Sequence, residues 1–257
     1  MKPTFLNHEK PLLTLLINTA DTPERFIAEI EKGNQDGAEA FGLQLEVLKR
    51  EYRTEQALRD IFSHCQGKPI YITSYRGGAS AGLSDDECVE FLLLGQKAGA
   101  TIMDIMGDLY HPERCQMTFD REAVEKQKAL VKRIHDNGGE VLFSAHLQDF
   151  YHEDDIMKFA FAQKERGADV VKLVSMANTP LELAEDVKVM ARMTLELGAH
   201  FLFLAGGEYC RFLRKAGGKL GSCMYLCIND YPENEKKIQP VLPNQVKLHE
   251  QLYKDSN

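Results

Sequence analysis

The chain has 257 residues, of which 44% are hydrophobic and 27% are charged, and this is enough for one globular domain with a large core. Its formal net charge of -8 argues against a protein that binds nucleic acid or anionic membranes, because both of these attract basic surfaces. No apolar run approaches the roughly 18 residues that cross a bilayer, and no N-terminal stretch has the layout of a signal peptide, so we expect a cytoplasmic protein.

Eight segments are short apolar runs of the kind that forms buried strands. In chain order they span residues 11–18, 37–46, 68–76, 99–108, 138–146, 167–176, 198–207 and 221–229. Four of these runs begin with a glycine that suits the left-handed conformation at the end of a preceding helix, namely Gly99, Gly138, Gly167 and Gly198. These glycines therefore indicate that a helix ends directly before each of the four strands.

Amphipathic stretches with a helical period lie between the apolar runs, at residues 23–35, 84–98, 120–137 and 179–197. Side chains that favour helix N-caps begin three of these stretches, namely Thr22, Ser84 and Thr179. The segment from Pro232 onward is predicted to form a loop and a closing helix.

The alternation of strands and helices favours parallel strands joined by crossover helices. Eight such units in about 250 residues predict a (β/α)8 TIM barrel, with a single domain over residues 1–257. An open doubly wound sheet is the alternative, but the first turn lacks the G-x-G-x-x-G phosphate fingerprint.

Polar side chains stand at the ends of the predicted strands, where TIM barrels place their reactive groups. The most informative are Asp104, His146 and Lys172, because each lies inside an apolar run or directly ends one. The full set is Asn18, Gln44, Glu46, Tyr75, Arg76, Asp104, Asp108, Ser144, His146, Lys172, Ser175, Glu208 and Ser222.

Lys172 interrupts the apolar run GADVVKLVSM, residues 167–176. An ammonium group in apolar surroundings loses hydration that nothing replaces. The nearest acidic residue, Asp169, points to the opposite face of a strand. We therefore expect an uncharged amine, which attacks ketones and aldehydes to form a Schiff base. His146 is on the preceding strand, and neighbouring strands are about 4.8 Å apart. It is expected to remove a proton from the carbon α to the imine.

Several of these segments resemble the type I 3-dehydroquinate dehydratases. VLFSAHLQDF resembles that family's histidine strand, and GADVVKLVSMA resembles its lysine strand. KPIYITSYR is similar to the strand that ends in a substrate-binding arginine, and EYCRFLRKAGGKLGS is similar to the Ser-Arg segment that runs to a Gly-Ser. Gln239, in KKIQP, stands where the family has a glutamine in its closing loop.

The resemblance implies a cofactor-independent lyase of the shikimate pathway of aromatic amino acid biosynthesis, which converts 3-dehydroquinate to 3-dehydroshikimate. Lys172 would form the imine with a cyclic keto-acid, and His146 would be the general acid and base. Arg211 would bind the substrate carboxylate, with Arg214 as an alternative because its spacing to Ser222 fits the family better. The other expected substrate-binding residues are Arg76, Gln239, Gln44, Glu46, Asp104 and Ser222. No metal is expected, and pairing through outer helices would give a homodimer.

The sequence departs from the family at three places. Gly42, Gln44 and Glu46 stand in place of a Glu-x-Arg-x-Asp sequence, Ser80 stands in place of a glutamate near the histidine, and Met106 replaces the glutamate of an Asp-x-Glu. Losing a carboxylate near His146 removes a group that would orient the ring. A cyclic keto-acid other than 3-dehydroquinate is therefore an open alternative for the substrate.

Two other functions remain open from the sequence. Glu46, Asp104 and His146, together with Gln44, could hold a divalent ion in a metal-dependent sugar isomerase or aldolase-type barrel. Alternatively, the missing carboxylates could mark a barrel that binds small acids without catalysis.

Overall fold

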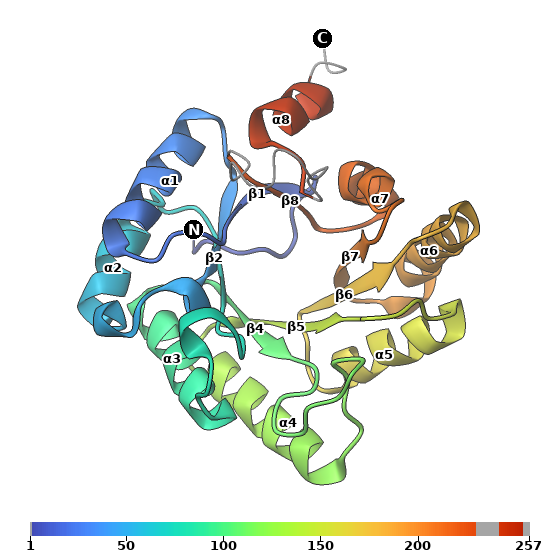
Figure 1. The fold of residues 1–257 in the computed structure, drawn as a ribbon, viewed down its shortest axis with the longest axis horizontal. Coiled ribbons are helices and arrows are strands. Elements are labelled where there is room, and N and C mark those ends of the chain that lie inside the picture. Colours follow the sequence, from blue (N-terminus) through green and yellow to red (C-terminus); the bar gives the residue numbers. More distant parts are fainter. Residues whose placement is uncertain (1, 230–241, 254–257) are drawn as a thin grey trace. The chain divides into compact units, whose positions relative to one another are not determined.

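The computed structural model describes residues 2–229 and 242–253. The strands form one eight-stranded sheet in the order β7-β6-β5-β4-β3-β2-β1-β8, and they alternate with helices along the chain (Figure 1). This confirms the predicted (β/α)8 TIM barrel class. No helix among the described residues is both long enough and apolar enough to cross a membrane.

The contacts within the chain define two compact units. Unit 1 comprises residues 1–5, 12–103 and 226–257, and unit 2 comprises residues 6–11 and 104–225. Two strands, β4 (Ile102–Met106) and β8 (Met224–Cys227), contribute residues to both units. The assignment of residues 1–257 to a single domain stays a prediction.

Unit 1 contains the first three strands and the helices that follow them. Its strands pair in parallel, with Gln44 at the end of β2 opposite Thr73 at the end of β3. The elements are β1 (Leu12–Ile17), α1 (Pro23–Gln35), β2 (Ala40–Gln44), α2 (Glu55–Ser63), β3 (Ile70–Thr73), α3 (Asp85–Ala98) and α8 (Gln245–Tyr253), with short 3-10 helices at Leu45–Val47, Arg50–Tyr52 and Gly78–Ser80.

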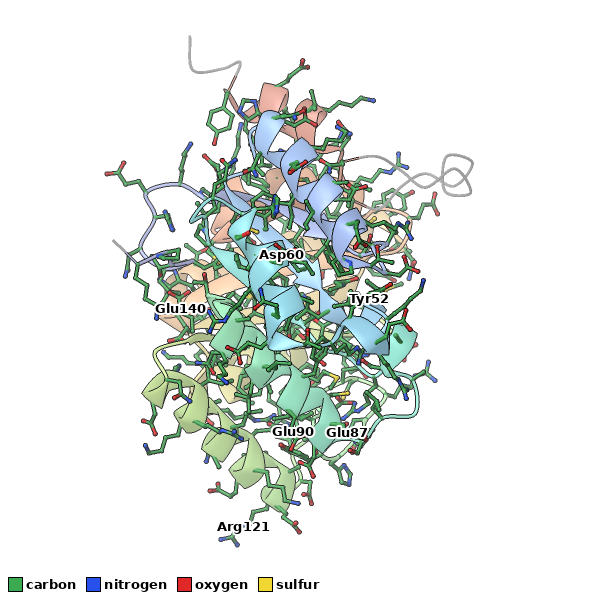
Figure 2. All side chains as sticks on the ribbon, turned by 90° about the vertical axis from the view of Figure 1, so that its left-hand side faces the viewer. Tyr52, Asp60, Glu87, Glu90, Arg121 and Glu140 are labelled. Atoms are coloured by element: carbon green, nitrogen blue, oxygen red, sulfur yellow. The ribbon has the colours of Figure 1, made fainter. Side chains whose placement is uncertain are left out.

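The helices of unit 1 begin where their caps predict. Thr22 accepts a hydrogen bond from Arg25 N, and Ser84 forms a reciprocal capping box with Glu87. Asp60 of α2 and Glu90 of α3 are exposed on the solvent sides of their helices (Figure 2). The opposite faces are apolar and buried, so these helices are stabilised mainly by packing against the strands.

Unit 2 contains the strands that carry the predicted nucleophile and base. In Figure 1, β5, β6 and β7 lie side by side, with α5 and α6 covering one face. Ser144 is the register partner of Lys172, and His146 is the partner of Val174. The elements are α4 (Arg121–Asp136), β5 (Glu140–His146), α5 (Glu153–Glu165), β6 (Val170–Met176), α6 (Pro180–Arg192), β7 (His200–Gly206), α7 (Arg211–Ala216) and a 3-10 helix at Gly217–Leu220.

One predicted helix differs from the structure. The stretch 179–197 is helical throughout, but α6 ends at Arg192 and a turn of π-helix continues from Met193 to Leu197. The hydroxyl of Thr194 donates to the carbonyl oxygens of Met190 and Leu220, so it competes with the regular backbone ladder at this point. The strand then begins after Gly198, which adopts the predicted left-handed conformation with φ 60°.

Candidate active site

Lys172 is buried in unit 2, and its partner is Asp104. The lysine side chain is 5% exposed and the aspartate side chain is 0% exposed, with 3.3 Å between Nζ and Oδ2. The expectation that the lysine has no acidic partner is therefore wrong. Asp104 lies 68 residues earlier in the chain, on β4, whereas Asp169 accepts hydrogen bonds from the Val141 backbone and His135.

The second carboxylate oxygen of Asp104 is also engaged. Ser144 Oγ donates to Asp104 Oδ1 at 2.5 Å, and Ser144 is the register partner of Lys172 on the neighbouring strand. Three buried polar side chains from β4, β5 and β6 thus meet, and we call Asp104, Ser144 and Lys172 the lysine cluster. The short hydrogen bond from Ser144 and the ion pair with Lys172 compensate part of the cost of burying the charges.

His146 lies two residues beyond Ser144 on β5, so both side chains leave the same face of the strand. The pKa of His146 lies well below its usual 6.5, mainly because burial disfavours the imidazolium and also because Lys172 and Arg214 are positively charged. The imidazole is therefore neutral at pH 7, which is the form that can accept a proton.

Gln116 is a hydrogen-bond partner of His146. Its Oε1 lies 3.0 Å from the backbone nitrogen of His146 and 3.1 Å from ring Nδ1. Sequence reasoning missed this residue, which lies on a long segment between β4 and α4. The one available indication was length, since the 14 residues from 107 to 120 exceed the usual 2–6 of a βα loop.

The two candidate carboxylate-binding arginines differ in their surroundings. Arg214, on α7, donates from Nε to Ala205 O of β7, and burial lowers the pKa of its guanidinium. Its charge contributes to the lowered pKa of His146, whereas Arg211, at the first position of α7, does not. The structure thus brings Arg214 into the electrostatic environment of the histidine.

Ser222 does not lie at the end of a strand as expected. It precedes β8, which begins at Met224, and its Oγ accepts a hydrogen bond from Phe203 N at 3.2 Å. The apolar run that contains it starts earlier than the strand does. Ser222 is 2% exposed and supports the backbone of β7.

Glu46, one of the predicted substrate-binding residues of unit 1, is hydrogen-bonded within that unit. Glu46 is 6% exposed, and its Oε2 accepts from Thr73 Oγ1 at 2.6 Å and from Tyr75 N at 3.4 Å. Gln44 ends β2 two residues before Glu46 and is partly exposed. The buried glutamate thus binds the end of β3 to the segment after β2.

Arg76 forms a bidentate ion pair within unit 1. Its Nε and Nη2 lie 2.6 and 2.8 Å from the two carboxylate oxygens of Asp85, the first residue of α3. Ser80, at the position of the family's glutamate, is buried and accepts a hydrogen bond from Arg53 Nη1. Arg50 donates to the carbonyl oxygens of residues 79 and 81, so two arginines hold this segment in place.

Gln239 lies outside the described residues. Within the described part of the chain, no three His, Cys, Asp or Glu side chains are grouped so that they could hold a metal ion. The ligand set suggested for a metal-dependent barrel, Glu46, Asp104 and His146, does not form such a group. Asp104 instead binds a hydroxyl and an ammonium.

Comparison with known proteins gives one family and several similar folds. The family model of type I 3-dehydroquinase matches residues 17–236. A 3-dehydroquinate dehydratase from Geobacillus kaustophilus superposes with a TM-score of 0.80 at 12% identity, over 96% of this chain and 92% of its own. A type I 3-dehydroquinate dehydratase from Clostridium difficile gives 0.79 at 13% identity, over 97% and 95%. The enzyme from Enterococcus faecalis gives 0.73 at 15% identity, over 88% and 92%. At these identities the superpositions show the fold, and a sequence search among curated proteins gave no match.

Proposed function

Because the chain belongs to the type I 3-dehydroquinase family of carbon–oxygen lyases, we propose that it is a Schiff-base dehydratase of 3-dehydroquinate or a related cyclic keto-acid. The observation that carries the proposal is the buried contact between Lys172 and Asp104. In this contact the amine of Lys172 lies beside the carboxylate of Asp104, which can take its proton. Lys172 is on β6, and the neutral His146 is on the neighbouring strand β5.

The amine of Lys172 must lose a proton before it attacks a carbonyl. Asp104 Oδ2, 3.3 Å away, is an acceptor within reach, and the Ser144 hydroxyl stabilises the other carboxylate oxygen. The free amine then adds to the ketone, and loss of water gives a protonated imine. The imine draws electrons from the neighbouring carbon, which makes the α-proton acidic.

His146 would then exchange protons with the substrate. Its neutral ring takes the α-proton, and the electron pair expels the hydroxyl group on the β-carbon, which leaves as water with the proton returned by the imidazolium. A second water hydrolyses the imine and releases the unsaturated keto-acid and the amine. The low pKa of His146 makes the imidazolium a strong acid for the second transfer.

Arg214 is the preferred group for the substrate carboxylate. Its planar guanidinium can bind a carboxylate in a bidentate manner. Such binding would offset the positive charge that lowers the pKa of His146, so the bound substrate would make the histidine a better base. Arg211 remains the alternative.

The residues of unit 1 that are expected to recognise the substrate do not specify a single cyclic keto-acid. Arg76 already binds Asp85 through two donors, and Glu46 binds Thr73 and the backbone. Ser80 replaces a carboxylate, and Gln44 replaces an arginine, so the groups that recognise hydroxyls differ from the family pattern. We include 3-dehydroquinate together with related cyclic keto-acids for this reason, and we propose a cytoplasmic, cofactor-independent enzyme that forms a homodimer.

Borohydride trapping tests the proposal directly. The protein is incubated with 3-dehydroquinate, with a panel of cyclic keto-acids, and with comenic acid, which is found covalently modified in the Clostridium difficile structure. Reduction of an imine should leave a covalent mass increase on the peptide that contains Lys172, and Lys172→Ala should abolish it. His146→Ala should retain the adduct and lose dehydration.

Two results would contradict the proposal. An adduct that persists in Lys172→Ala would place the nucleophile elsewhere. No adduct with any compound, together with measurable binding of the acids, would instead support a small-acid-binding protein without catalysis.

A further inference from the structure

The contacts of Gln116 determine which nitrogen of His146 carries the proton. The backbone N–H of His146 can only donate, so the Gln116 atom 3.0 Å away must be the amide oxygen. The same oxygen lies 3.1 Å from ring Nδ1. An amide oxygen can only accept, and Nδ1 must therefore be the donor. A neutral imidazole protonated on Nδ1 carries its basic lone pair on Nε2.

We propose that Gln116 is a positioning residue that holds His146 in the Nδ1–H tautomer, so that Nε2 is the nitrogen that exchanges protons with the substrate. The assignment of the tautomer follows from the two hydrogen bonds, and the role of Nε2 rests on the proposed function.

The backbone around Gln116 is arranged to bring its side chain to β5. Gln116 adopts the left-handed conformation with φ 50°, which is uncommon for a residue other than glycine. Gly107 N donates to Ser144 O at 2.7 Å, which joins the start of the same segment to the strand of His146. A Cβ atom at Gly107 would lie 2.6 Å from Gln116 O, so only glycine permits this close approach.

A buried arginine holds the segment at both ends. Arg166 of the α5 C-terminus is 4% exposed, and its guanidinium donates to the carbonyl oxygens of Gly107 and Thr118. It also donates to Gln127 Oε1, and the amide of Gln127 in turn donates to Leu109 O. Three carbonyl oxygens of the segment from 107 to 118 thus accept hydrogen bonds from buried side chains, which fixes the position of Gln116 relative to β5.

The choice of an amide has a chemical consequence. An ionised carboxylate at this place would also select the Nδ1–H tautomer, but it would stabilise the imidazolium and raise the pKa of His146. The amide oxygen of Gln116 orients the ring without adding a negative charge. The histidine therefore stays neutral beside Lys172 and Arg214, the two cations that lower its pKa.

Nitrogen NMR of the protein labelled with ¹⁵N-histidine tests the inference without substrate. The ring resonances of His146 are assigned by their loss in His146→Gln. At pH 7.5 we expect Nδ1 to be the protonated nitrogen in the wild type and in Gln116→Glu, and we expect the Nε2–H form to appear in Gln116→Leu. Gln148→Leu is the matched control, because the exposed Gln148 donates only to the backbone carbonyl of His146 and its loss should leave the tautomer unchanged.

A titration of Gln116→Glu provides a second readout that does not need the leucine variant. The added carboxylate should raise the pKa of His146 toward its usual 6.5 or above, because a nearby negative charge stabilises the imidazolium. Lys172 is already paired with Asp104. A wild-type spectrum with protonated Nε2, a Gln116→Leu variant that keeps Nδ1–H, or an unshifted titration would overturn the inference.

Kinetics separate this inference from the proposed function. In Gln116→Leu we expect kcat to fall about 10- to 100-fold with little change in KM, and borohydride trapping on Lys172 to be retained. If trapping fails in the wild type while the tautomer is as expected, the proposed reaction is wrong, and the assignment of the Nδ1–H tautomer to the contact with Gln116 still stands.

Discussion

Asp186 is a buried carboxyl group that should make the stability of the protein depend on pH. It lies on α6 with 0% exposure, and neither carboxylate oxygen has a hydrogen-bond partner. The Ser175 hydroxyl of β6 lowers its pKa, although the two groups do not form a hydrogen bond of normal geometry. Burial raises the pKa to about 7 from 3.8, and the charges of Glu182 and Glu185 add to this.

The sign of the effect follows from where the proton binds. The folded state holds the proton on Asp186 up to about pH 7, whereas the unfolded chain releases it near 3.8. Stability is therefore lost as the pH rises from 3.8 through 7, because the folded state must bury a carboxylate. The full difference is roughly 4 kcal/mol at 1.36 kcal/mol per pKa unit, and about 2–3 kcal/mol of it falls between pH 5 and pH 8.

Asp186→Asn removes the titration and keeps the shape of the side chain. Urea unfolding followed by far-UV circular dichroism at pH 5, 6, 7 and 8 gives the free energy of unfolding of each protein. The Asn variant should gain about 2–3 kcal/mol relative to the wild type between pH 5 and pH 8. Asp155→Asn, at an exposed position of α5, controls for the loss of one negative charge. A difference between wild type and Asp186→Asn that stays constant with pH would refute the reasoning.

Three further predictions concern the site. Arg214→Met should raise the pKa of His146 and move the acidic limb of kcat/KM to higher pH, because one of the cations that disfavours the imidazolium is removed. Arg211→Met should leave that limb in place, and equal shifts in the two variants would show that Arg214 is not the closer charge. Gly107→Ala should lower the free energy of unfolding by about 1–3 kcal/mol and reduce kcat, because the new Cβ displaces the backbone of Gln116; urea unfolding and steady-state kinetics measure both. Prolonged dialysis against a chelator should leave dehydration unchanged, and recovery of lost activity by a divalent ion would favour the metal-dependent alternative.

The sequence by itself determined the order and type of the main elements. Helix periods, N-cap residues such as Ser84 and glycines such as Gly167 are local properties of neighbouring residues, and the structure places the elements where these features predict. The position of Lys172 inside a strand was also visible, because it interrupts a continuous apolar run that can be read from the chain alone. The sequence therefore named Lys172 and His146 as candidates, and their catalytic roles stay predictions.

Only the tertiary structure decided which groups these residues contact. Asp104 and Lys172 are 68 residues apart in the chain, and they meet because their strands belong to the same sheet. Gln116 contacts His146 from a loop whose path depends on the buried Arg166. Hydrogen bonds and charge pairs act over a few ångströms, and the chain brings such distant residues within that range only when strands pair and loops close. Local patterns cannot specify these distances, which is why the amine was expected to be alone and is instead paired with a carboxylate.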